Sequence, residues 1–163
     1  MWNGLESWRR GGVAVVLTLV LALILGLATP AAAKEASLVM DADTGRVLSA
    51  ANADNRNHPA SLTKMMTLYL VFEALESGRW GLTSPITASA RAARQPASRM
   101  GLAPGQTITV EQAILALVTK SANDVATAVA EAMDRQERDF ALRMTAKARA
   151  LGMTRTTFRN ASG

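Results

Sequence analysis

The sequence contains no cysteine, one histidine and few aromatic residues, which make up 4% of its 163 positions. Without cysteine the chain forms no disulfide bonds, so its fold depends on the burial of apolar side chains. Hydrophobic residues make up 49% and charged residues 19%, a composition typical of a globular domain. The formal net charge of +5 is not gathered into a Lys/Arg block beside aromatic residues, so nucleic-acid binding is not indicated.

The first 33 residues have the organisation of a secretory signal peptide. Arg9 and Arg10 give a basic start, residues 13–28 form an almost unbroken apolar run, and Thr-Pro-Ala-Ala-Ala follows before Lys34. This pattern predicts export by the general secretory pathway and cleavage before Lys34. An uncleaved membrane anchor is the alternative, because about 18 apolar residues are the lower limit for spanning a bilayer. We therefore expect a mature domain over residues 34–163 in the periplasm or cell envelope.

The mature sequence opens with two short β-prone runs, at residues 37–40 and 46–49, around the turn Asp-Ala-Asp-Thr-Gly. This pattern predicts a β-hairpin. The turn also resembles the nucleophile loops of phosphatases and of aspartic proteases. The first loop needs Thr or Val where Gly45 stands, and the second needs another aspartate loop that the sequence lacks. We therefore interpret the segment as a hairpin turn.

The next part of the chain is expected to contain a helix and then a loop. Apolar residues after Pro59 recur in steps of three and four, which predicts a helix that ends near Gly78. The segment over residues 83–106 is rich in proline and glycine, which is typical of a loop.

Three further helices are predicted. Thr109 and Gln112 have the spacing of a capping box, which marks the start of a helix that runs toward Ser121. Helices are also expected over residues 124–133 and 139–151. A hairpin followed by a mostly helical body places the fold in the α+β class.

The first candidate site is the Ser-x-x-Lys sequence formed by Ser61 and Lys64. Residues three apart on a helix share one face, so the two side chains can touch. A serine hydroxyl becomes a nucleophile when a base removes its proton, and a lysine can serve if burial lowers its pKa. A helix start would add backbone N–H groups that stabilise an oxyanion. Taken alone, the pattern is better explained by a capping serine and a solvated lysine.

The second candidate is Ser-Ala-Asn at residues 121–123, where one predicted helix ends and another begins. Such a junction can project the side chains of Ser121 and Asn123 into a cleft, although both residue types are also common helix caps. His58 precedes Pro59, which favours an extended backbone, and is interpreted as a loop residue. Lys120 is explained by its position on the last turn of a helix.

The blocks NRNHPASLTKMMT, SANDVA and LGMTRTTFRNASG, in this order, resemble the D-alanyl-D-alanine carboxypeptidases. These are the low-molecular-weight penicillin-binding proteins of the serine β-lactamase-like superfamily. The resemblance implies a serine β-lactamase/DD-peptidase-like α+β fold. It also implies removal of the terminal D-alanine from peptidoglycan stem peptides through a serine ester, and acylation of the same serine by β-lactam antibiotics.

Carried over by motif, Ser61 is the expected nucleophile, Lys64 its general base, and Ser121 a proton relay toward the leaving amine. Asn123 is expected to bind the substrate backbone. The family's reaction needs no metal or other cofactor, which agrees with a chain that has one histidine and no cysteine. The resemblance implies peptidoglycan as the partner and leaves association with the inner membrane open.

The family's third motif, Lys-Thr-Gly, is absent from the sequence. The resemblance therefore implies an N-terminal portion of the catalytic domain, without the later sheet strands, and an activity that the chain alone need not show. A class A β-lactamase is disfavoured because no Glu-x-x-x-Asn run follows Asn123. A D,D-endopeptidase of peptidoglycan cross-links and a non-catalytic peptidoglycan-binding module remain alternatives.

Overall fold

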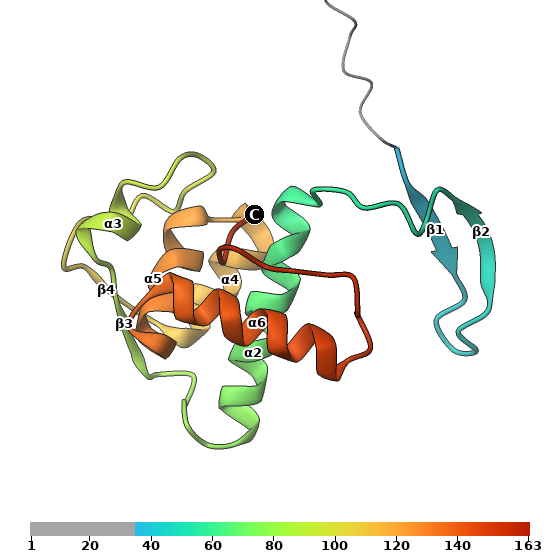
Figure 1. Ribbon diagram of the computed structural model, residues 1–163. Helices are drawn as coiled ribbons and strands as arrows, with labels where there is room; N and C mark the ends of the chain where they lie inside the picture. The colour runs from blue at the N-terminus through green and yellow to red at the C-terminus, as the bar shows by residue number, and fades with distance from the viewer. Residues whose placement is uncertain (1–34) are drawn as a thin grey trace, which may run out of the picture. The chain divides into compact units, whose positions relative to one another are not determined.

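The computed structural model describes residues 35–163, which fall into two compact units, one reaching Asn55 and one running from Arg56 to Gly163 (Figure 1). The signal peptide predicted over residues 1–33 lies outside the described residues. Within the described part of the chain, no helix is long and apolar enough to cross a membrane. The first unit carries a hairpin, and the second carries the helices and the candidate site.

The hairpin predicted at the start of the mature sequence is confirmed. Strand β1 (Ser37–Met40) pairs antiparallel with β2 (Val47–Ala51). The Asp41 carboxylate holds the turn, because it accepts hydrogen bonds from the backbone N–H of Thr44, at 2.8 Å, and from the Thr44 hydroxyl group. Gly45 has a φ of +70°, which glycine adopts without steric cost. The Asp-Thr-Gly sequence therefore forms the turn of the hairpin, as the sequence predicted.

The second unit starts with one turn of 3-10 helix, η1 (Ala60–Leu62), which leads directly into α2 (Thr63–Glu76). The helix predicted after Pro59 is confirmed, with a tighter first turn than expected. It ends where Gly78 adopts a φ of +69°. The apolar residues that α2 buries are Met66, Leu70, Val71 and Ala74.

The segment predicted as a loop over residues 83–106 contains regular structure. Strand β3 (Pro85–Thr87) pairs antiparallel with β4 (Thr107–Thr109), and the short helix α3 (Ala90–Ala93) lies between them in sequence. The loop prediction was wrong for β3 and α3. A proline is tolerated as the first residue of a strand, and the Ser89 hydroxyl caps α3. The strand pair buries Ile86 and Ile108.

Helix α4 (Val110–Lys120) begins with the predicted capping box. The Thr109 hydroxyl accepts a hydrogen bond from the backbone N–H of Gln112 at 3.2 Å, and the Gln112 side-chain oxygen accepts one from the Thr109 N–H at 2.9 Å. The box satisfies two backbone donors that a helix start otherwise leaves without partners.

We expect Thr109→Ala to lower the free energy of unfolding by about 1 kcal/mol, because the N–H of Gln112 loses its acceptor. Urea unfolding followed by circular dichroism measures the change. Thr83→Ala is the matched control, since Thr83 is exposed and caps no helix, and its change should stay within about 0.5 kcal/mol. Equal losses in the two variants would contradict the assignment of the cap.

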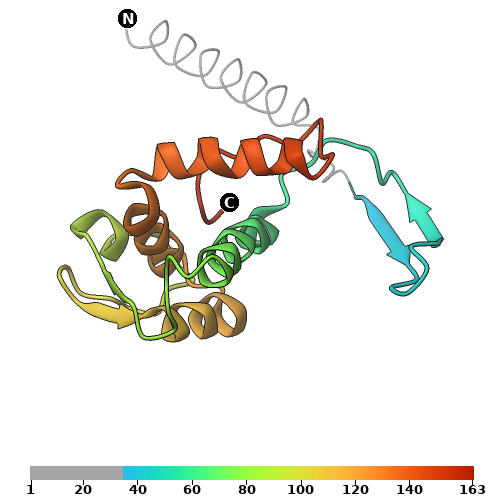
Figure 2. The same ribbon diagram turned by 90° about the horizontal axis from the view of Figure 1, so that it is seen from below.

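Helix α5 (Asn123–Asp134) is the centre of the second unit and contacts α2, α3, α4, α6 and β3. Helix α6 (Glu137–Ala150) packs along it, and both helices confirm the predicted ones with small shifts at their ends. After α6 the chain runs back and ends beside the start of α2 (Figures 1 and 2). The largest apolar side chains with almost no exposure are Phe140, Ile86, Met144, Val71, Val110, Val125 and Val129.

Candidate functional site

Ser61 and Lys64 come together at the start of α2. Ser61 lies exposed in η1, Lys64 lies in the first turn of α2, and the lysine Nζ is 3.3 Å from the serine Oγ. The contact predicted from their spacing is therefore present. Lys64 is only 3% exposed and takes part in none of the ion pairs among residues 35–163. Burial lowers the pKa of its amine below the ordinary value of 10.5, which favours the neutral, basic form.

The Lys64 amine has a second partner at the other end of the unit. Its Nζ donates a hydrogen bond to the backbone carbonyl of Ser162 at 2.9 Å. One turn further along α2, the buried Thr67 hydroxyl donates to the carbonyl of Ala161 at 2.8 Å. Two successive carbonyls of the segment Asn160–Gly163, called here the 160–163 segment, thus lie against the face of α2 that carries Lys64.

The 160–163 segment has its own internal support. The Asn160 side-chain oxygen accepts hydrogen bonds from the N–H groups of Ser162, at 3.1 Å, and of Gly163. Gly163 has a φ of +89°, and a Cβ atom there would lie 2.0 Å from the carbonyl oxygen of Ala60. The close approach to η1 therefore requires glycine at this position.

Ser121 and Asn123 lie at the junction of α4 and α5. Ser121 ends α4 in the left-handed conformation, with φ 53° and ψ 41°, and is half-buried. Asn123 is the first residue of α5, and its side-chain amide donates a hydrogen bond to the carbonyl of Pro96 at 3.0 Å. The amide keeps its oxygen and a second N–H hydrogen for another partner. Both predicted residues therefore occupy a helix junction, as expected.

Asp124 binds the loop over residues 96–102 to this junction. Its role was not predicted from the sequence. The buried carboxylate accepts hydrogen bonds of 2.8–3.0 Å from the N–H groups of Met100, Gly101 and Leu102, and one from Val125 at 2.9 Å. Burial by itself raises the pKa of Asp124, but these N–H groups outweigh it and lower the pKa below 3.8. The only signal in the sequence is an acidic residue among the apolar residues of a helix start.

The structure does not join the two candidate pairs by a direct hydrogen bond within residues 35–163. They are connected through the packing of α2 against α4 and α5. His58 lies exposed before η1, and Lys120 is the exposed last residue of α4, in agreement with their interpretation as loop and helix-end residues. The described residues contain no group of His, Cys, Asp and Glu side chains that could hold a metal ion.

The fold is that of the penicillin-binding DD-peptidases. A crystal structure of the D-alanyl-D-alanine carboxypeptidase DacD from Francisella tularensis superposes with a TM-score of 0.76 at 34% identity, over 78% of this chain and 31% of that one. Penicillin-binding protein 5 from Haemophilus influenzae gives 0.74 at 32% identity, over 78% and 38%. A penicillin-binding protein from Listeria monocytogenes, in its ampicillin-bound form, gives 0.70 at 32% identity, over 78% and 51%.

A sequence model of D-alanyl-D-alanine carboxypeptidases matches residues 26–163, and the chain belongs to this family. It is 36% identical over 129 residues to the carboxypeptidase DacF of Bacillus subtilis, covering 79% of this chain and 33% of that protein. It is 34% identical over 140 residues to DacC of Escherichia coli, covering 82% and 35%. The chain thus spans about a third of the length of these curated relatives.

Proposed function

We propose that the protein is a serine-type D-alanyl-D-alanine carboxypeptidase that removes the terminal D-alanine of peptidoglycan stem peptides. The observation that carries the proposal is the buried Lys64 amine, 3.3 Å from the exposed Ser61 hydroxyl, in a chain of this family. The exposed serine is open to a substrate, and burial lowers the pKa of the lysine amine, which favours its neutral form. The four site residues predicted from the sequence receive their roles within this proposal.

In the proposed acylation, the Ser61 Oγ attacks the carbonyl carbon of the penultimate D-alanine while the neutral Lys64 amine takes the hydroxyl proton. The C–N bond then breaks, and the departing D-alanine amine receives a proton through the Ser121 hydroxyl. Water next attacks the ester, which releases the shortened peptide and returns the hydrogen to Ser61. Asn123 holds the substrate backbone through its side-chain amide.

The position of Ser61 favours the charge that develops in this reaction. The negative oxygen of the tetrahedral intermediate forms next to the serine, which lies in η1 directly before the start of α2. Aligned peptide dipoles make a helix start favourable for negative charge.

The same serine is the proposed target of β-lactam antibiotics. In this reaction the lactam C–N bond opens, its carbonyl carbon becomes esterified to the Ser61 Oγ, and the lactam nitrogen takes the proton. Support comes from the structural likeness to the Listeria protein in its ampicillin-bound form. The signal-peptide pattern supports action on peptidoglycan in the periplasm or cell envelope, with or without attachment to the inner membrane.

The test is covalent labelling of the purified chain with a fluorescent penicillin, with the mass of the product determined. We expect one penicillin per chain, and none in Ser61→Ala. Ser77→Ala is the matched control, because Ser77 lies at the opposite end of α2, and it should be labelled like the parent chain. An unlabelled parent chain would contradict catalysis by this chain alone, and labelled Ser61→Ala would contradict the choice of nucleophile.

Digestion of muropeptides separates the proposal from its close alternative. A carboxypeptidase shortens monomers by one alanine, whereas an endopeptidase splits cross-linked dimers. Dimer cleavage without loss of alanine would replace carboxypeptidase by endopeptidase while keeping the same site. Binding to peptidoglycan without either reaction would favour a non-catalytic module.

A further inference from the structure

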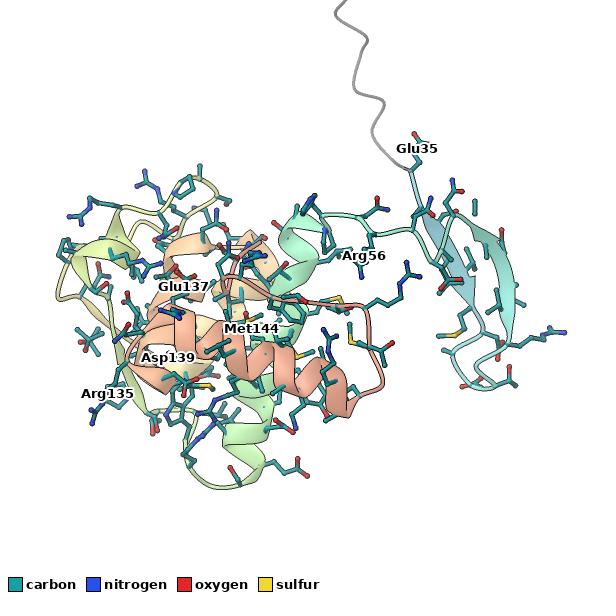
Figure 3. All side chains as sticks on the ribbon, viewed as in Figure 1. Glu35, Arg56, Arg135, Glu137, Asp139 and Met144 are labelled. Carbon is teal, nitrogen blue, oxygen red and sulfur yellow. The ribbon has the colours of Figure 1, made fainter. Side chains whose placement is uncertain are left out.

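Glu137 is a buried acid that the proposed reaction does not use. It is the first residue of α6 and only 3% exposed (Figure 3). An acid at a helix start is often explained by the helix dipole. The Glu137 carboxylate also has partners on two other helices. It forms an ion pair with Arg91 of α3 and lies 3.5 Å from the Thr127 hydroxyl of α5. A buried carboxylate is stable only with such partners.

The third partner of Glu137 leads to the candidate site. The backbone N–H of Ala161, a fully buried residue, donates a hydrogen bond to the Glu137 Oε1 at 3.0 Å. The carbonyl of the same residue accepts the Thr67 hydroxyl at 2.8 Å. Ala161 is thus held from α6 through its N–H and from α2 through its C=O. The next carbonyl along the chain, that of Ser162, accepts the Lys64 amine.

We propose that Glu137 is a positioning residue for Lys64, which acts by fixing the 160–163 segment against α2. This inference rests on the proposed function of Lys64 as the base. With the segment fixed, the amine is held by its hydrogen bond to the Ser162 carbonyl, and its nitrogen stays 3.3 Å from the Ser61 Oγ, within reach of the hydroxyl proton. The segment also keeps water from the amine, which sustains its burial.

What the segment needs from Glu137 is an acceptor oxygen, while the negative charge is secondary. The Ala161 N–H is neutral, and a glutamine side-chain oxygen can accept it equally well. Arg91 pairs with the other carboxylate oxygen, Oε2, so the hydrogen bond from the Ala161 N–H to Oε1 does not depend on this ion pair. Two substitutions therefore test the acceptor. Glu137→Gln keeps an oxygen that accepts the Ala161 N–H, and Glu137→Ala removes it.

The direct readout is the pKa of Lys64, measured by NMR on the chain with isotope-labelled lysine. The sequence contains four lysines, and Lys64→Arg identifies the signal. In Glu137→Ala we expect the pKa of Lys64 to rise toward the ordinary lysine value, because the loosened segment admits water. The rate of penicillin acylation near neutral pH should fall at least about tenfold, because less of the base is neutral and correctly oriented. In Glu137→Gln and Arg91→Ala both quantities should stay at the parent values.

An unchanged pKa of Lys64 in folded Glu137→Ala would overturn the proposal, as would a shift in Glu137→Gln as large as that in Glu137→Ala. If Glu137→Ala fails to fold, Thr67→Val provides the second test. It removes the other hydrogen bond on Ala161 and should raise the pKa of Lys64 in the same direction.

The two readouts separate this inference from the proposed function. A Lys64 pKa that depends on Glu137 in a chain that penicillin does not acylate would support the positioning role and contradict the catalytic one. Acylation that proceeds normally in Glu137→Ala, with an unchanged pKa of Lys64, would support the catalytic role and overturn the positioning one.

Discussion

Lys64→Met is expected to slow penicillin acylation of Ser61 by about 100- to 10,000-fold, because the hydroxyl loses its base. Methionine fills the buried space of the lysine stem and carries no proton-accepting nitrogen, so the packing of α2 should persist. The free energy of unfolding should change little, since the loss of the hydrogen bond to the Ser162 carbonyl is offset by the removal of a buried amine. Quenched labelling gives the rate, and urea unfolding gives the stability.

The matched control is Lys120→Met, in which an exposed lysine at the end of α4 is replaced. Its acylation rate should remain at the parent value. The pH profile adds a second check, because burial lowers the pKa of Lys64 below 10.5. The rate should rise with pH through the Lys64 pKa, with a midpoint below 10.5, and the profile of Lys64→Met should lack this step. An equal loss of rate in Lys120→Met would contradict the assignment of the base.

Local patterns in the sequence predicted much of the fold, because they are formed by residues close together in the chain. The Thr109 capping box and the contact between Ser61 and Lys64 each join residues three positions apart, and a helix places such pairs side by side. The strand β3 was missed because the prolines and glycines around it also mark loops, and its partner β4 lies beyond them.

The supports of the candidate site depend on contacts between residues far apart in the sequence. Lys64 and Ser162 are separated by 98 positions, and Glu137 and Ala161 by 24. In the sequence, Asp124 and Glu137 are ordinary acids near helix starts, which the helix dipole explains. Only packing shows that their carboxylates face buried N–H groups of other segments. The residue types near Ser61 therefore indicated a serine nucleophile with a lysine base. The residues that hold this pair in place could be identified only from the structure.

Asp124→Ala is expected to lower the free energy of unfolding by about 3 kcal/mol, because four backbone N–H groups lose their acceptor at once. The loss is smaller than the sum of the separate hydrogen bonds, since water can reach part of the freed loop. Asp139→Ala is the matched control: Asp139 is an exposed acid in the first turn of α6, and its change should stay within about 0.5 kcal/mol (Figure 3).

The loss in Asp124→Ala should also depend on pH in a fixed direction. The pKa of Asp124 is lower in the folded chain than its ordinary value of 3.8, so the carboxylate stabilises the fold fully above pH 3.8. This contribution disappears as the pH falls through the lower folded pKa, and the difference between the parent and the variant should shrink accordingly. Urea unfolding at neutral pH and at several acidic pH values measures it. A difference that stays constant would show that Asp124 acts by packing, and the charge of its carboxylate would then have no part in holding the loop at Asn123.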